Sequence, residues 1–271
     1  MFGHTFYHDT IRKYVILFGT LFNDITINRR TESNKTVSIK VPLTYAPKEK
    51  MLARIEGDPN LNRPAIVLPR MGFEMNTINY ASERKLNTVT KHVALDASDD
   101  NKLKYSYMHV PYDFNFTLYI AVKNADDGTR ILEQILPFFT PSWTSTVNLI
   151  PELGIKLDIP VILNSVTSED TYEGNFETRR ALTWDLTFTL KGYIFGPVKS
   201  GEIIKLANTN FYDTTVYDNI DSAVGDADVV SSVDVKPGLL ANGSPTSNSS
   251  LTVSVDQINA NDNYGYIITK A

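Results

Sequence analysis

The chain reads FETRRALTWDLTFTLKGYIFGPV from Phe176 to Val198. Leucine and aromatic residues fill every second position from Leu182 to Leu190, and threonine and aspartate fill the positions between them. Because successive side chains of a strand point to opposite faces, this alternation predicts a strand with one buried and one solvated face. Helical spacing aligns only the leucines, whereas interleaved aromatic and threonine residues fit a pleated surface.

The predicted strand is long. At ~3.3 Å per residue, Leu182 to Phe195 spans about 40 Å. We therefore expect a strand that crosses a whole sheet or overhangs into a neighbouring subunit.

Composition bounds the class of protein. The 271 residues suffice for one large or two modest domains, and an aromatic content of 11% is typical of a packed protein. The chain has no cysteine, which excludes disulfides, thiolate zinc sites and cysteine nucleophiles. Neither an apolar run of membrane length nor a signal peptide is expected, and we expect no membrane partner.

Charge is distributed unevenly along the chain. Residues 201–271 contain nine acids and three lysines, a net charge of −6, whereas the first 200 residues carry 22 acids and 23 bases. Neither part has the basic excess of a nucleic-acid binder, so specific nucleic-acid recognition is not expected.

The N-terminal pattern predicts a helix followed by a hairpin. Residues 9–23 have an apolar stripe wide enough to be covered on both sides, with Asp9 or Thr10 as the cap and Gly19 packed against a neighbour. Residues 25–29 and 37–41 then alternate as two strands joined by a turn over 31–35. The charged tip, Arg29, Arg30 and Glu32, is either solvated or in contact with a partner subunit.

The middle of the chain mixes short helices with strands, which predicts an α+β fold of mostly antiparallel sheet with a few packed helices. Expected helices cover 47–57 and 126–136; expected strands cover 66–68, 72–80, 102–123, 146–150 and 157–165; loops cover 141–143 and 168–175. Asp126 or Asp127 caps the second helix, whose buried stripe is Ile131, Leu132, Ile135 and Leu136 and which Pro137 ends. Pro111 marks a bulge or an edge, because proline cannot donate to a ladder.

The composition changes at Lys199. We expect two domains, residues 1–198 and an Asn/Asp/Ser-rich C-terminal extension over 199–271. Within the extension, 241–250 is linker-like, and 251–255 and 264–268 have strand patterning. We expect the extension to be held by its own domain or by a partner, and one hypothesis is that it is an extended arm that reaches a neighbouring protein.

Catalytic and metal-binding motifs are missing from the sequence, and we expect no catalytic, cofactor-binding or metal site. His4 and His8 are four residues apart but belong to no HExxH pattern, and His109 is expected to be a packed or surface residue. The glycine-rich, P-loop and nucleophile-elbow patterns do not occur.

Acidic and basic residues near the predicted loops are further candidates for a functional role. Glu152 with Asp158, and Glu169 with Asp170 and Glu173, are conceivable acid/base groups, but acids are ordinary in loops. Asp226, Asp228 and Asp234 lack the glycine and terminal glutamate of an EF-hand loop. Arg179 and Arg180 either protect a strand edge or form an inter-subunit salt bridge.

Five ordered segments resemble one family. They are MFGHTFYHDTIRKYVILFGTLFNDITINRR, VPLTYAPKEK, ILEQILPFFTPSW, IPVILNSV and RRALTWDLTFTLKGYIFGPV, which lie between residues 1 and 198. They resemble the tail sheath stabiliser, or tail-completion protein, of large contractile-tailed bacteriophages (myoviruses). The resemblance stops near Lys199.

The resemblance implies a structural virion protein without a reaction or cofactor, with a fold like that of tail terminators. It implies a homo-hexameric ring at the head-proximal end of the tail, made in the host cytoplasm and assembled in the neck region. Its implied partners are the tail sheath protein, the tail tube terminator and the neck proteins of the head, with DNA passing through the lumen.

Two other classes remain open on the residues alone. A β-rich binding or decoration module predicts a monomer or trimer with a ligand surface. An enzyme, such as a glycan hydrolase using loop carboxylates, predicts a pocket that gathers several acids.

Overall fold

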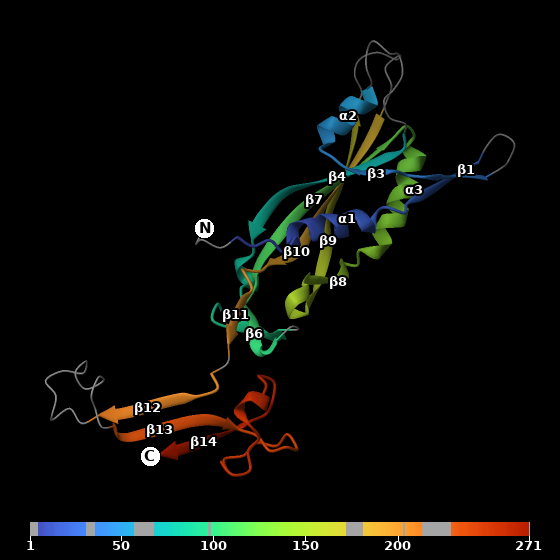
Figure 1. The fold of residues 1–271 in the computed structure, drawn as a ribbon. Helices are drawn as coiled ribbons and strands as arrows, with labels where there is room; N and C mark the ends of the chain where they lie inside the picture. Colours follow the sequence, from blue (N-terminus) through green and yellow to red (C-terminus); the bar gives the residue numbers. More distant parts are fainter. Residues whose placement is uncertain are drawn as a thin grey trace. The chain divides into compact units, whose positions relative to one another are not determined.

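A computed structural model describes residues 5–30, 36–56, 68–96, 99–171, 181–202, 204–212 and 229–270 (Figure 1). The chain divides into two compact units. Unit 1 comprises Met1–Thr90 and Tyr107–Pro197, and unit 2 comprises Lys91–Ser106 and Val198–Ala271. Each unit is described by itself.

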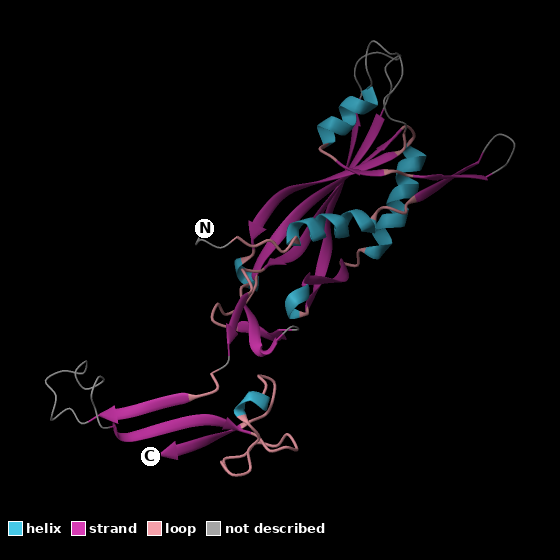
Figure 2. Ribbon diagram, in the orientation of Figure 1, coloured by secondary structure: helices cyan, strands magenta, loops and turns pink. Residues whose placement is uncertain are grey.

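Unit 1 is organised around a six-stranded sheet in the order β3-β4-β7-β10-β9-β8. The strands are β3 (Leu43–Tyr45), β4 (Arg70–Tyr80), β7 (Val110–Val122), β8 (Ser142–Ile150), β9 (Ile155–Thr171) and β10 (Ala181–Ile194). Every neighbouring pair is antiparallel except β3 and β4. The predicted α+β class with a mostly antiparallel sheet is therefore confirmed (Figure 2).

β10 is the long strand predicted from the alternating sequence. It pairs with β7 along its length, from Leu182 opposite Val122 to Ile194 opposite Val110, and with β9 on its other side. It lies within the sheet and crosses it, as one of the two expectations for its length required.

The two faces of β10 differ less than the alternation predicts. Leu186, Phe188 and Leu190 are fully buried as expected. At the other end Thr183 is buried and Trp184 is only half-buried. The reason is that this end of the second face is also covered: Thr183 lies beside Ala121, which packs under Met51 of helix α2 (Lys48–Glu56).

Two helices cover the first face of the sheet, α1 (Thr10–Leu21) and α3 (Ala125–Ile135) (Figure 1). Phe18 of α1 stacks on Phe116 at 4.5 Å between ring centroids and contacts Phe188 edge-on. Gly19 lies against Phe73: an added Cβ would sit 3.0 Å from that ring, which confirms the predicted close packing.

Three expectations for these helices are wrong. α1 is covered on one side only, because Ile11 and Ile16 are exposed. The cap of α3 is Asn124, so Asp126 and Asp127 lie inside the first turn, and Leu136 is exposed instead of buried.

The α-helix α3 stops at Ile135 and continues as the 3-10 turn η2 (Leu136–Phe138), which contains Pro137. Asp9 stands at the N-cap of α1 without a side-chain capping bond.

The predicted hairpin is present as β1 (Thr26–Arg30) and β2 (Thr36–Lys40), with Ile27 opposite Ile39. Its turn, 31–35, lies outside the described residues, as does most of the predicted strand 66–68. The predicted helix over 47–57 is confirmed by α2.

Three local expectations are corrected. Pro111 is the second residue of the central strand β7 and pairs opposite Tyr193, so it marks neither an edge nor a bulge. Ser142 and Trp143 begin strand β8 instead of forming a loop. Residues 168–171 continue β9, opposite 181–184, and the rest of the predicted turn lies outside the described residues.

Unit 2 contains two three-stranded sheets, ordered β11-β6-β5 and β12-β13-β14. The strands are β5 (Lys91–Asp96), β6 (Asp99–Tyr107), β11 (Lys199–Glu202), β12 (Ala207–Tyr212), β13 (Val229–Gly238) and β14 (Gly265–Lys270). The predicted β-rich run 102–123 is thus divided between β6 of one sheet and β7 of another.

The segment between β13 and β14 is folded back on its own sheet, so the prediction of a linker over 241–250 is wrong. Thr246 donates its backbone N–H to the carbonyl of Gly238, and Val253 donates to Leu239. The predicted strand 251–255 is also wrong: these residues form a turn that leads into the 3-10 helix η4 (Val255–Gln257). The predicted strand 264–268 is confirmed by β14.

Candidate interaction surface

The described histidines that were candidates for ligands or bases, His8 and His109, make contacts within the chain. His8 lies 2.9 Å from the carbonyl oxygen of Gly196 through its Nε2, and His4 lies outside the described residues. His109, in the short connection that precedes β7, is buried with its ring 4.3 Å from the ring of Tyr193, which confirms that it is a packed residue. Among the residues that the structure describes, no cluster of His, Asp and Glu could hold a metal ion.

The candidate acid/base carboxylates are not gathered in one cavity. Glu152 is exposed in the 3-10 turn η3 (Pro151–Leu153), and Asp158 accepts a hydrogen bond from Thr146 at 2.5 Å. Glu169 pairs with Lys48, and Asp234 accepts from Asn208. The other candidates lie outside the described part of the chain: the side chain of Asp170, and residues Glu32, Glu173, Arg179, Arg180, Asp226 and Asp228.

Lys48 holds α2 on the second face of the sheet. Its ammonium lies 2.5 Å from Asp185 and 2.7 Å from Glu169. Burial alone would lower the pKa of Lys48, but hydrogen bonds and charge from these two carboxylates raise it overall. Beside it, burial and a hydrogen bond to Glu74 raise the pKa of Tyr119, which keeps that hydroxyl protonated. These ion pairs hold helix α2 against strands β9 and β10 of the sheet.

The rest of the second face carries an uncharged polar ladder across four strands. Asn115 donates to Thr77 at 2.8 Å, Thr189 donates to Asn115 at 3.0 Å, and Asn164 donates to Thr189 at 2.7 Å. These polar side chains are hydrogen-bonded to one another across the strands. The ladder therefore stabilises the pairing of the strands on this face.

Arg29 of the hairpin is engaged within the chain, so it is not a free charge at the tip. Its guanidinium forms a two-pronged ion pair with Asp127 of α3, which is almost fully buried. Along the same edge, Arg130 donates to the carbonyl of Asn28 and Gln134 to that of Thr26. Side chains of α3 thus close the outer edge of β1, while the described edge of β2 opposite β1 stays exposed.

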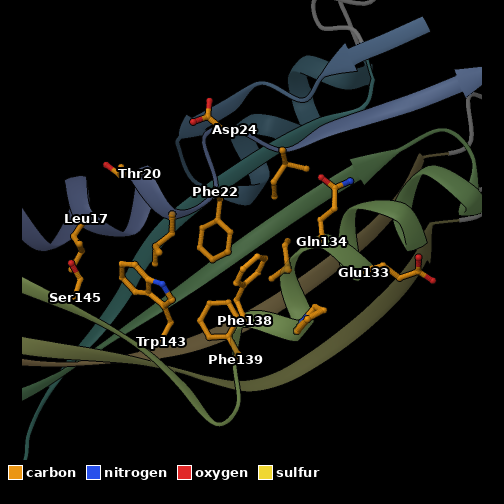
Figure 3. Close-up of a pocket in the computed structure, with 14 residues that line it drawn as sticks. Leu17, Thr20, Phe22, Asp24, Glu133, Gln134, Phe138, Phe139, Trp143 and Ser145 are labelled. Carbon is orange, nitrogen blue, oxygen red and sulfur yellow. The ribbon is translucent and has the colours of Figure 1, made fainter. Parts of the chain in front are cut away.

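An apolar groove lies where α1, α3 and β8 meet (Figure 3). Its volume is about 870 Å³. The lining residues come from the end of α1 and the following turn (Leu17, Thr20, Leu21, Phe22, Asp24, Ile25), from α3 and η2 (Glu133, Gln134, Ile135, Pro137, Phe138, Phe139) and from β8 (Trp143, Ser145).

The groove is aromatic at its floor and acidic at its rim. Phe139 packs against Phe22 and against Phe188 of the core, so the floor continues the aromatic packing of the sheet face. Phe138 remains 68% exposed, although a ring of this size is usually buried. Figure 3 shows the carboxylates of Asp24 and Glu133 turned outward at the rim.

One wall of the groove is an open strand edge. In the described part of the chain, β8 ends the sheet and pairs with β9 alone. Its register shifts between Asn148 and Ile150, and the carbonyl of Leu149 accepts a hydrogen bond from Lys13 of α1 at 2.8 Å. The irregularity closes one end of the edge, while Ser142 to Val147 present unpaired backbone groups beside the groove.

An open edge next to an apolar groove can bind an extended segment. The edge supplies main-chain hydrogen bonds, and the groove accepts alternate side chains of the added strand. Sequence analysis missed this surface because it assigned Trp143 to a loop. The alternation of Trp143, Ser145 and Val147 with polar neighbours could have extended the strand to that residue.

Membrane insertion finds no support in the helices: in the described ranges none combines the length and hydropathy of a spanning segment.

Comparison with known proteins gives a consistent result. A family model described as the T4-like virus Myoviridae tail sheath stabiliser matches residues 5–262. The protein "Tail completion protein gp15" of Enterobacteria phage T4 is 30% identical over 246 residues, which cover 84% of this chain and 89% of that protein. The match extends well beyond Lys199, so the limit at which the resemblance stopped is corrected, and most of unit 2 is shared with these relatives.

Proposed function

The chain belongs to the tail sheath stabiliser family of T4-like Myoviridae, and from this premise we propose that six copies form a ring at the head-proximal end of the contractile tail. Membership of the family makes the chain a structural component of a myovirus tail. The ring, its position in the neck and its partners are our proposal.

The ring solves a physical problem of the sheath. Subunits of a helical polymer associate through heterologous contacts that do not close, so the last layer is left with unsatisfied surfaces. A closed ring with the same rotational symmetry covers that layer and offers no further polymer site. We propose that this ring binds the sheath protein and the tube terminator on one side and the neck proteins of the head on the other.

The observation that carries the proposal, beside the family, is the apolar groove with the open edge of β8. It is suited to an extended protein segment, because apolar and aromatic side chains line it beside the outer strand of the sheet. We therefore propose a binding role without catalysis. The net charge of −5 fits DNA passing through the lumen without specific recognition.

The C-terminal extension, 199–271, is included in the proposal as a region that reaches a neighbouring protein. β12 and β14 are the outer strands of their sheet, and Phe211, Tyr266 and Ile268 on them are exposed. Open edges with exposed apolar side chains are typical of interaction sites.

Two measurements test the proposal. Native mass spectrometry and negative-stain electron microscopy of the purified protein are expected to show a closed six-membered ring. Cryo-electron microscopy of the phage particle is expected to place it where the sheath meets the neck. A stable monomer or trimer bound to the capsid would refute the ring and favour a decoration module.

A further inference from the structure

Two aromatic side chains before α1 are exposed to solvent. Phe6 is 50% exposed and Tyr7 is 79% exposed, and Thr5–His8 belong to neither a helix nor a strand. The segment is anchored at its end, where the imidazole of His8 lies 2.9 Å from the Gly196 carbonyl. Exposed aromatic rings on an anchored segment outside any helix or strand are suited to insertion into another surface.

The apolar groove lies at the other end of the same helix. Thr5–His8 precede the first turn of α1, whereas Leu21 and Phe22, at its last turn, line the groove. A helix of 12 residues is about 18 Å long at ~1.5 Å per residue. Segment and groove both belong to unit 1 and lie toward opposite ends of this helix, so they are separate surfaces of one unit.

We propose that the segment Thr5–His8 of one copy binds in the groove of the next copy, beside the open edge of its β8. The assignment rests on the ring proposed above and names the contact that closes it. A contact between two different surfaces of the same subunit is heterologous, or head-to-tail, and it closes into a ring when the rotation per copy permits.

The chemistry of the two surfaces is complementary. The groove offers aromatic packing from Phe22, Phe138 and Phe139, and its wall offers unpaired backbone groups of β8. The segment offers exposed aromatic rings and a backbone that belongs to neither a helix nor a strand. Neighbouring side chains of an added strand point to opposite faces of the sheet, so one ring enters the groove and the other lies on the opposite face.

Charge also permits the contact. The rim carries the carboxylates of Asp24 and Glu133, and the segment Thr5–His8 contains no acidic residue that would repel them. A second copy is favoured over another protein because both halves of the contact are present on this chain.

Site-directed disulfide formation tests the contact directly, because the full-length chain has no cysteine of its own. In the double variant Phe6→Cys/Ser145→Cys, oxidation is expected to give a ladder of covalent oligomers up to the closed ring. The matched control is Phe6→Cys/Thr144→Cys, in which the second thiol lies on the opposite face of the same strand. Equal ladders from both pairs, or an oxidised monomer from the first pair, would overturn the proposal.

A second variant keeps the test independent of cysteine chemistry. Phe6→Ser/Tyr7→Ser is expected to raise the concentration needed for ring formation by at least about tenfold, as for buried aromatic anchors. Its thermal unfolding should be unchanged, because both side chains are already exposed. Tyr266→Ser in unit 2 is the control for loss of an exposed aromatic residue.

The outcomes separate this inference from the proposed function. If the wild-type protein forms six-membered rings but the Phe6→Ser/Tyr7→Ser variant forms them equally well, the segment-in-groove contact is wrong and the ring stands. If the wild-type protein forms no ring at all, both are wrong.

Discussion

Tyr14 joins α1 to the end of β10 through a single hydroxyl. That oxygen donates to the carbonyl of Tyr193 at 2.8 Å and accepts from its backbone N–H at 2.8 Å. β9 pairs with β10 only as far as Leu190, so Tyr193 lies beyond that ladder. Burial raises the pKa of Tyr14, so the hydroxyl stays neutral and can serve both groups.

We predict that Tyr14→Phe lowers the free energy of unfolding by about 2 kcal/mol, because it leaves buried backbone groups without partners. Urea unfolding followed by circular dichroism measures the change. Tyr266→Phe, which alters an exposed hydroxyl in unit 2, is the control and should have little effect.

A second residue-scale prediction compares two ion pairs of unit 1. Asp127 is 4% exposed beside Arg29, whereas Asp24 and Lys40 are 89% and 58% exposed. We expect Arg29→Ala to cost about 3 kcal/mol of unfolding free energy, because a buried carboxylate loses its partner. Lys40→Ala should cost less than about 1 kcal/mol. Equal losses in denaturant melts would show that the Asp127 site is solvated when Arg29 is removed.

Helix α2 provides a prediction at the scale of an element. Lys48 has a pKa raised in the folded state, so its stabilising effect is fully present below the unfolded pKa of about 10.4 and is lost as pH rises through the folded pKa. Lys48→Met should therefore be less stable than wild type by about 1–2 kcal/mol near pH 8, because Asp185 loses its partner.

The difference between wild type and Lys48→Met should shrink as pH rises through the raised pKa of Lys48, where the wild-type ammonium loses its proton. Chemical unfolding at a series of alkaline pH values measures this convergence. Lys50→Met, on the exposed side of the same helix, is the matched control. A gap that stays constant with pH would assign the effect of Lys48 to packing.

The elements that could be predicted from the sequence are those whose environment follows from local periodicity. β10 and the hairpin have clear alternation, and α1 has a clear apolar stripe. What failed depended on distant partners. Thr183 is buried only because α2 packs nearby, and Asp127 resembles a cap until Arg29, 98 residues away, is placed beside it.

The groove belongs to the same class of failure. Its walls come from three segments that are far apart along the chain, and no local pattern records that they meet. The family resemblance, in contrast, came from long ordered motifs and is confirmed over residues 5–262.

The division into two units gives a prediction for the whole molecule. Every strand of the six-stranded sheet ends before Pro197. The buried residue Phe195 also precedes Pro197. A chain that stops after Pro197 should therefore keep the cooperative thermal unfolding of unit 1. If residues 199–271 reach a neighbour, the shortened chain should bind the ring or the sheath more weakly.

Co-sedimentation with sheath polymers, and sizing of the shortened chain, measure that loss. Unchanged association would remove the role proposed for the extension. Loss of the thermal transition itself would instead show that unit 1 needs unit 2 in order to fold.

The irregularity at Leu149 has a consequence for how far association can proceed. Lys13 and the shifted register seal β8 after Val147, which leaves an edge of roughly six residues, about 20 Å long. An added strand cannot continue regular pairing beyond the register shift, so the edge sets a maximum length for the segment that pairs with it. A short edge that ends in an irregular register limits edge-to-edge pairing between copies. This feature therefore protects the unassembled protein from aggregation through β8.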